Sequence, residues 1–368
     1  TAGVGFPAGA FMLDRDGVNT WCVKLTGQNT VIRGVKNRTV LKLREGQDNS
    51  ALAIFLLDDL RGFTFRDIVF DGNWGNAMTQ IDAVADDQDG YALTNGMTIP
   101  VNSTTGFPAS GTATICFLDG TVTTITYASK TSTSFVNCTG GSGTVQRGFS
   151  VVLLNDHTGI NHDDQVDPKH LMIMARGGGD HKFEHCHFQN IYGDAFWFGA
   201  STDDDLFNAA RNCSIVDCSI DLMGRNGITF GSHCDNISIV RTRIENTWTT
   251  CVDAESQGYD VPVRGISIDN CLLRPWPSYP AGGWGQAISC IAGNPSGYNH
   301  ASAARNWRIV DNEIYGFTSI ADAIDVVFSR NHVVVNFTDN DVSPDSVAPV
   351  YISHASDNIL ISDNWIYD

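Results

Sequence analysis

The chain has few positive charges and no long apolar segment. Its 368 residues include 23 Lys and Arg against 41 Asp and Glu, a formal net charge of −18. Nucleic-acid binding requires a basic face that neutralises phosphates, so this balance argues against nucleic acid as a partner. No apolar run approaches the roughly 18 residues of a membrane span. We therefore expect neither nucleic-acid binding nor membrane insertion.

Familiar catalytic motifs and a disulfide framework are also missing. The sequence contains no nucleophile elbow, no P-loop and no dinucleotide fingerprint. Its ten cysteines are even in number, but Cys186, Cys218 and Cys271 share one position of a repeat where other copies carry Thr or Asn. Such a position is typical of small residues stacked inside a coil, which predicts free buried thiols. The expected spacing of about 4.8 Å between neighbouring coils does not forbid a bridge between Cys186 and Cys218.

What the sequence does contain is a six-residue pattern that recurs along its length. The pattern is an apolar residue, two mostly polar residues, a small or amide residue, any residue, and a second apolar residue. Copies begin at Phe65, Phe183, Ile215, Ile239, Ile268, Ile309, Phe337 and Ile361. The small residues Cys218 and Thr242 lie 24 positions apart, and other intervals are longer. A short basic interval with occasional additions predicts stacked coils of a solenoid with loops inserted on some turns.

A second strand follows each pattern at a fixed distance. Its inward residues are Asp194, Phe196 and Phe198 in one coil, Thr250, Val252 and Ala254 in another, and Gln286, Ile288 and Cys290 in a third. After Asn312 we expect Asp322, Ile324 and Val326. The residues between them alternate outward. Stacking then predicts one outward column along the solenoid, formed by Trp197, Thr229, Asp253, Ser289, Asp325 and Tyr351.

The pattern divides the chain into three parts. Residues 1–87 are expected to form N-terminal coils, and residues 149–368 the main body of the solenoid. Between them, residues 88–148 lack the repeat and are rich in Thr, Ser and Gly, with short alternating runs. We expect this segment to form a small inserted β module, whose size makes it marginal as an independent fold.

These features together resemble the right-handed parallel β-helix of the pectin-lyase-like superfamily. The resemblance is carried by Phe6 to Phe11, Ile32 to Val35, Phe65 to Asn73 and the Asp-Asn pairs from 311 to 364. It implies an all-β solenoid, a scaffold that supports lyases, hydrolases, epimerases and inert adhesins. The inserted segment, from Gly106 to Thr144, is similar to a module of bacteriophage tail proteins. That similarity implies a tailspike or minor tail protein of the virion tail, which binds and often cleaves the host's surface polysaccharide.

Carboxylates of the outward column are the candidate catalytic residues. Asp253 and Glu255 lie on the same face of one strand and should be about 6.5–7 Å apart. Asp253 and Asp325 should lie two coils and roughly 9–10 Å apart. Both separations are closer to the roughly 6.5–9.5 Å of inverting glycosidases than to the shorter distance of retaining ones. We therefore predict that Asp253, Glu255 and Asp325 share the acid and base roles of a glycoside hydrolase. An exposed acidic face that only interacts with solvent is the alternative.

Aromatic residues around this column predict where a glycan would bind. Their apolar rings with polar neighbours suit the face of a sugar, although they could equally pack loops onto the coil. The candidate binding residues are Trp197, His233, Trp248, Tyr259, Trp276 and Trp284.

Two further functional classes stay open from the sequence. One is a receptor-binding or structural tail protein without catalysis, and the other is a polysaccharide lyase on the same scaffold. No metal site or cofactor is expected, although the acidic runs at 162–164 and 203–205 leave a calcium ion open. The resemblance further implies a homotrimer whose partners are a host cell-surface polysaccharide and other tail proteins.

Overall fold

The structure of the chain is a computed structural model that describes most of the sequence. The described residues are 2–14, 19, 21–44, 53–73, 77–81, 91–105, 107–116, 122–145, 150–153, 171–191, 193–200, 209–231, 233–247, 249–255, 263–275, 286–291, 304–334, 349–353 and 356–367. Within these ranges the ordered elements are strands, and no helix long and apolar enough to cross a membrane is found.

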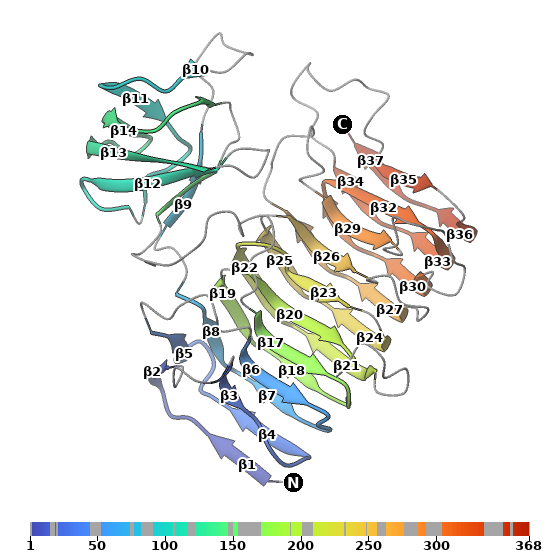
Figure 1. Cartoon of the computed structure of the whole chain (residues 1–368). Coiled ribbons are helices and arrows are strands. Elements are labelled where there is room, and N and C mark those ends of the chain that lie inside the picture. Colours follow the sequence, from blue (N-terminus) through green and yellow to red (C-terminus); the bar gives the residue numbers. More distant parts are fainter. Residues whose placement is uncertain are drawn as a thin grey trace.

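Three long parallel sheets run side by side along the molecule (Figure 1). Sheet A consists of β1 (Ala2–Gly5), β4 (Thr30–Arg33), β7 (Thr64–Arg66), β18 (Lys182–Glu184), β21 (Ala210–Val216), β24 (Cys234–Val240), β27 (Arg264–Asp269), β30 (Ala304–Val310), β33 (Ala323–Ser329) and β36 (Asp357–Ser362). Sheet B consists of β2 (Gly9–Leu13), β5 (Thr39–Leu43), β8 (Val69–Asp71), β19 (His187–Ile191), β22 (Ser219–Met223), β25 (Arg243–Thr247), β28 (Leu272–Arg274), β31 (Glu313–Tyr315), β34 (His332–Val334) and β37 (Trp365–Tyr367). Sheet C consists of β3 (Trp21–Lys24), β6 (Ala53–Asp58), β17 (Leu171–Arg176), β20 (Asp194–Gly199), β23 (Ile228–Phe230), β26 (Thr250–Ala254), β29 (Gln286–Ile291), β32 (Phe317–Ala321) and β35 (Val350–Ser353).

Each coil of the solenoid contributes one strand to each sheet, because the chain passes from sheet A to sheet B to sheet C and then begins again. The six-residue pattern forms the passage from A to B, and the following strand lies in sheet C. The predicted all-β fold, a right-handed parallel β-helix, is thereby confirmed.

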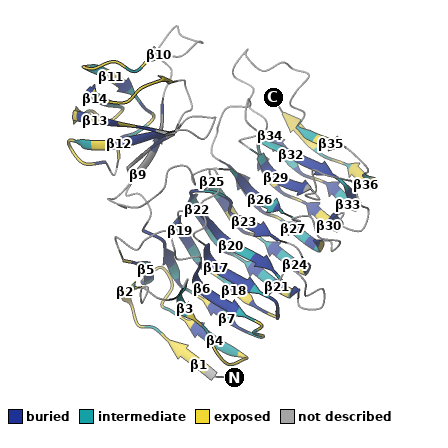
Figure 2. Ribbon diagram, in the orientation of Figure 1, coloured by how far each residue is buried: buried dark blue, intermediate teal, exposed yellow. Residues whose placement is uncertain are grey.

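Inward residues of successive coils stack on one another and form the core (Figure 2). The ring of Phe65 stacks on Phe183 with centroids 5.2 Å apart, and Phe70 stacks on Phe188 at 4.8 Å. Val252 and Ile288, which the alternation predicts to point inward, are both fully buried. Apolar burial at equivalent positions of each coil is therefore what holds the coils in register.

The corner between sheets A and B is built from two residues of the pattern. The residue before the small position adopts a left-handed backbone conformation, as at Asp311 with φ of 57° and Arg330 with φ of 54°. The small position itself points inward, and its amides form a ladder. The backbone N–H of Asn312 donates to the side-chain oxygen of Asn331 at 3.1 Å, and that of Asn331 to Asn364 at 2.9 Å. This ladder satisfies backbone groups that the sharp corner leaves without a strand partner.

Cysteines occupy the same small position in earlier coils, as predicted. Cys186, Cys218 and Cys271 are buried and free. The same holds for Cys138, Cys213, Cys234, Cys251 and Cys290, whereas Cys22 is free but only partly buried. Burial raises the pKa of the Cys271 thiol to about 12. These thiols therefore behave as small apolar side chains.

The inserted module is antiparallel, unlike the solenoid. Its main sheet has the order β11 (Met97–Pro100), β14 (Ser134–Thr139), β13 (Val122–Lys130), β12 (Gly111–Cys116), β16 (Ser150–Leu153) and β9 (Ala77–Gln80). A two-stranded sheet pairs β10 (Tyr91–Ala92) with β15 (Thr144–Val145). The module has a core of its own, which includes Ile115, Ile125 and Phe135. Strands β9 and β16 lie outside residues 88–148, so the sheet takes in chain from both flanks of the predicted segment.

One coil is shorter than the sequence pattern predicted, and this moves Asp325. Only 19 residues separate Asn312 from Asn331, because β32 follows β31 almost directly and β33 already begins the next coil. The copy of the pattern that starts at Phe328 was missed, and the copy predicted at Phe337 lies outside the described residues. The prediction that Ile324 and Val326 follow Asn312 in the second strand is therefore wrong, and Thr318 and Ile320 take these places.

Asp325 consequently lies in sheet A and not in the outward column of sheet C. It has φ of 60° and matches Asn306 and Asn358, the left-handed residues of neighbouring coils. Its side chain accepts a hydrogen bond from the side-chain amide of Asn358 at 3.0 Å. The place assigned to Asp325 in the column belongs to Ser319, which pairs with Ser289 and Tyr351.

Candidate active site on sheet C

A column of outward residues crosses the strands of sheet C. The registers of β20, β23, β26, β29, β32 and β35 place Trp197, Thr229, Asp253, Ser289, Ser319 and Tyr351 in this column. With the exception of Asp325, this is the predicted order. Asp253 lies near the middle of the column, and Glu255 follows it just beyond the end of β26. The backbone N–H of Glu255 still donates to Phe230 at 2.7 Å, which fixes the backbone from which its side chain projects.

Arg225 connects two carboxylates from different coils. One of its guanidinium nitrogens donates to Asp194 at 2.7 Å, and another donates to Glu255. The guanidinium side chain is 14% exposed, Glu255 21%, and Asp194 is fully buried. Because Arg225 and Asp194 lie largely out of water, the interaction between these two groups is stronger than that of a surface ion pair.

Amide and hydroxyl groups complete this network. Asp194 also accepts from the backbone N–H of Asn226 at 2.9 Å and from the Thr229 hydroxyl at 2.7 Å. The side-chain amide of Asn226 donates to Asp253 at 3.1 Å. The three donors satisfy the buried Asp194 carboxylate, which the alternation placed on the inward side. The network was not predicted, since its members come from three coils.

The proton affinity of Glu255 is strongly altered by this environment. Burial raises the pKa of Glu255 from 4.5 to about 8, Arg225 opposes the rise, and the neighbouring Asp253 and Asp194 carboxylates add to it. Burial likewise raises the pKa of Asp194, against the effect of Arg225. Glu255 therefore carries a proton at neutral pH beside Asp253, which is the arrangement required of a general acid.

Asp253 and Glu255 project from neighbouring places on the same face. Their backbone positions are two residues apart along the chain, as expected. A side-chain hydrogen bond with Asp253 is among the causes that raise the pKa of Glu255, so the two carboxyl groups face one another. The separation expected of an inverting glycosidase stays a prediction for this pair.

Trp197 packs flat against the same face. Its ring lies directly over Gly199 and Gly231, where an added Cβ would come within 2.2 and 2.6 Å of ring atoms. It also packs against a cluster that contains Leu56 and Met174 of the same face. The two glycines are thus required to seat the indole of Trp197, whose strand lies two coils from the strand that precedes Glu255.

Of the remaining predicted binding residues, only His233 lies within the part of the chain that the structure describes. His233 is 1% exposed and has φ of 65°, so it lies below the surface at a corner, a placement that does not suit contact with a substrate. Trp248, Tyr259, Trp276 and Trp284 lie outside the described residues, as do the acidic runs at 162–164 and 203–205. Among the residues that are described, no group of three or more His, Cys, Asp and Glu side chains has a metal-binding arrangement. The predicted lack of a cofactor stays a prediction.

Comparison with known proteins agrees on the fold. No family model matches the sequence, and no curated protein matches it. The A-module of mannuronan C-5 epimerase AlgE6 from Azotobacter vinelandii superposes with a TM-score of 0.52 at 11% identity, over 99% of this chain and 67% of that one. Pre-mature gene product 12 of bacteriophage phi29 gives a TM-score of 0.50 at 11% identity, over 98% of this chain and 41% of its own length. Tailspike protein gp49 of Pseudomonas phage LKA1 is more distant, with a TM-score of 0.44, 13% identity, and coverage of 100% and 55%.

The chain therefore has the right-handed parallel β-helix fold. It spans between 41% and 67% of the length of these three structures. At identities of 11–13% the likeness defines the scaffold alone, and the chemistry has to be argued from the residues of this chain.

Proposed function

We propose that this β-helix binds a polysaccharide along the outer face of sheet C and cleaves it by glycoside hydrolysis. Glu255 donates a proton to the glycosidic oxygen as the glycosidic bond breaks, and Asp253 acts as the base that takes a proton from the water molecule attacking the anomeric carbon. The observation that carries the proposal is a carboxyl group with a pKa of about 8, partly open to solvent, beside a second carboxyl. The scaffold is compatible with such a substrate, since the similar epimerase is named for its action on mannuronan, a polysaccharide.

Arg225 supports this role by its position. In the resting state, burial keeps the proton on Glu255. Once that proton passes to the leaving oxygen, Glu255 becomes an anion in contact with the Arg225 guanidinium. A preorganised cation beside a developing charge lowers the barrier of the transfer. The bound sugar would have to displace the hydrogen bond between Glu255 and Asp253, which opens the space between the two carboxyl groups.

The cellular setting of this activity is also a proposal. The resemblance of the inserted module to phage tail proteins supports a location in the virion tail, with a host cell-surface polysaccharide as substrate and other tail proteins as partners. Assembly into a homotrimer stays a prediction.

The proposal is tested by cleavage of a panel of host capsular and cell-wall polysaccharides. Wild type should lower their viscosity and release reducing ends without ultraviolet absorbance. Glu255→Gln keeps the shape of the side chain but removes the acid, and it should lower the cleavage rate by at least about 100-fold. Glu184→Gln, a matched change on sheet A beside Arg66, should leave the rate unchanged.

Two outcomes favour the alternatives. Products that absorb in the ultraviolet indicate elimination and therefore a lyase. Binding without cleavage by wild type on every polysaccharide indicates a receptor-binding or structural tail protein. The second alternative has a specific observation in its favour, because Asp194, Asp253 and Glu255 all have hydrogen-bond partners within the protein.

A further inference from the structure

A groove lies on a different part of the molecule, along the corner where sheet A turns into sheet B. It has a volume of about 710 Å³ and is lined by residues of β25, β28, β31, β34 and β37 and of the turns before them. These strands are neighbours in sheet B, so none of them contributes to the column of sheet C. The Asp253 site and the groove therefore occupy separate faces.

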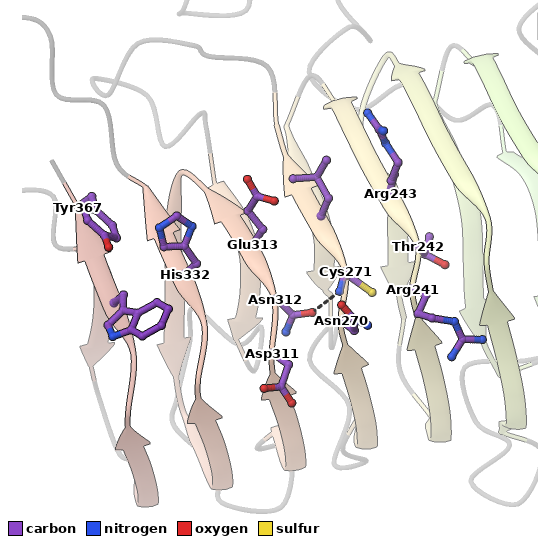
Figure 3. Close-up of a pocket in the computed structure, with 12 residues that line it drawn as sticks. Arg241, Thr242, Arg243, Asn270, Cys271, Asp311, Asn312, Glu313, His332 and Tyr367 are labelled. Carbon is purple, nitrogen blue, oxygen red and sulfur yellow. Dashed lines mark hydrogen bonds between the residues drawn. The ribbon is translucent and has the colours of Figure 1, made fainter.

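The wall of the groove is a second outward column. Register places Arg243, Leu272, Glu313, His332 and Trp365 side by side on consecutive strands. Figure 3 shows Arg243, Glu313, His332 and Tyr367 following one another across these strands. Four inter-strand steps of about 4.8 Å give the column a length of about 19 Å. A ligand that follows it has to be elongated, as an oligosaccharide is.

One end of the groove presents aromatic rings to solvent. In the last coil Trp365 is 69% exposed and Tyr367 51%, but the inward Ile366 is 51% exposed as well, so the direction of the side chains and not their exposure sets the two aromatic residues apart. Between them Ile366 pairs with the fully buried Val333, so the alternation of β37 directs both aromatic side chains outward. The Tyr367 ring also contacts His332 edge to face, with centroids 4.8 Å apart. Exposed indole and phenol rings with polar neighbours offer flat apolar surfaces that match the C–H face of a sugar.

The charged groups of the groove are already paired within the protein. Arg241 donates two hydrogen bonds to Asp217 at 2.8 and 2.9 Å, and Asp311 accepts two from Arg330 at 2.8 and 2.6 Å. Arg243 is paired with Glu245 at 2.9 Å. Glu313, which also lines the groove, accepts a hydrogen bond from the Tyr315 hydroxyl at 2.5 Å. With Glu313 these groups carry three positive and four negative charges, so they offer no positive excess that would attract an anion. The ion pairs fix the orientation of the guanidinium and carboxylate groups, and their remaining donors and acceptors can form hydrogen bonds with the hydroxyl groups of a sugar.

We propose that this groove is a second carbohydrate-binding site, which takes a neutral oligosaccharide with one sugar stacked on Trp365. The site is independent of the hydrolysis proposed for sheet C, and it would hold the polysaccharide at a surface remote from Glu255. A long polysaccharide that is bound at one face is held at a high effective concentration near the other face, so binding at both faces raises the overall affinity.

The test measures binding of the full chain to immobilised neutral polysaccharides (dextran, mannan and galactan) and acidic ones (alginate and polygalacturonate). Wild type is expected to bind at least one neutral polysaccharide. Trp365→Ala should weaken that binding at least tenfold, as loss of an aromatic anchor does, and Tyr367→Ala should weaken it as well. Both side chains point into solvent, so the thermal unfolding midpoint should stay close to that of wild type.

Two controls separate this proposal from the proposed hydrolysis. Leu360→Ala removes another exposed apolar side chain of the same coil, 54% exposed on sheet A, and should bind as wild type does. Glu255→Gln should also bind as wild type does, whether or not wild type cleaves any polysaccharide. Failure of wild type to bind a neutral polysaccharide, preference for the acidic ones, or full binding by folded Trp365→Ala would each overturn the proposal.

Discussion

The proton on Glu255 makes the stability of this protein depend on pH over a range in which an ordinary carboxyl group no longer titrates. In the unfolded chain the group has its usual pKa of 4.5, and in the folded protein the pKa is about 8. Between these values the folded state binds a proton that the unfolded state has released. Unfolding then releases a proton and becomes easier as the pH rises. The stability contributed by the protonated form is complete below pH 4.5 and is lost as the pH increases to 8.

The size of this effect follows from the same two values. Each pH unit corresponds to about 1.4 kcal/mol, so an increase from 4.5 to about 8 sets an upper bound of roughly 5 kcal/mol. The side chain is 21% exposed, and contact with solvent reduces the figure. We expect the free energy of unfolding of wild type to fall by about 2 kcal/mol between pH 5 and pH 8 relative to Glu255→Gln. The Gln side chain has no proton to lose, yet it can still donate to Asp253 and accept from Arg225.

The measurement is urea unfolding of both proteins at unit intervals from pH 5 to pH 9. Other groups cancel in the comparison. Burial lowers the pKa of His181 to about 4, so this residue favours the folded state as the pH rises, but it is present in both proteins. Glu184→Gln serves as a control, and its free energy of unfolding should change with pH as that of wild type does. If the free energies of unfolding of wild type and Glu255→Gln change in parallel between pH 5 and pH 8, Glu255 does not carry a proton in this range and the reasoning is refuted.

Two further predictions concern the stacks that hold the coils together. Asn331→Ala removes the side-chain oxygen that accepts from Asn312 and the side-chain amide that donates to the Ile309 carbonyl at 3.0 Å. The buried groups left unpaired should lower the free energy of unfolding, measured by urea titration, by about 2–4 kcal/mol. A loss below about 0.5 kcal/mol would contradict a structural role for the ladder. Phe188→Ala removes a fully buried ring that stacks on Phe70 with centroids 4.8 Å apart. The resulting cavity should lower the free energy of unfolding by about 3–5 kcal/mol in the same titration. Unchanged stability would mean that the coils are not stacked in this register.

Much of the solenoid could be predicted because every coil has to bury apolar side chains at the same positions of its strands. Val252 and Ile288 were placed inward by alternation alone, and the position shared by Cys186, Cys218 and Cys271 was recognised as an inward small-residue stack. The resemblance to pectin-lyase-like proteins independently predicted the same parallel β-helix. A repeat makes such predictions robust, since one residue type at one position has the same neighbours in every coil.

The misplacement of Asp325 shows where the pattern fails. Its coil is the short one, and counting forward from Asn312 with the offsets of longer coils assigns the wrong strand. The signal was present in the sequence, because Phe328, Asn331 and Val333 fit the six-residue pattern. Recognition of that copy would have placed Asp325 with Asn306 and Asn358, the left-handed residues near the start of the sheet A strands, where Asx side chains are favoured.

The sequence by itself determined the coil, its inward residues, and the outward column that contains Asp253 and Glu255, since all of these depend on a local period of two and a repeat along the chain. Only the tertiary structure decided the chemistry of the column. Arg225 reaches Asp194 and Glu255 from a different coil, and burial rather than sequence spacing keeps the proton on Glu255. Stacking fixes which backbones are neighbours, but rotamers and the exclusion of water decide which side chains meet and which of them are charged.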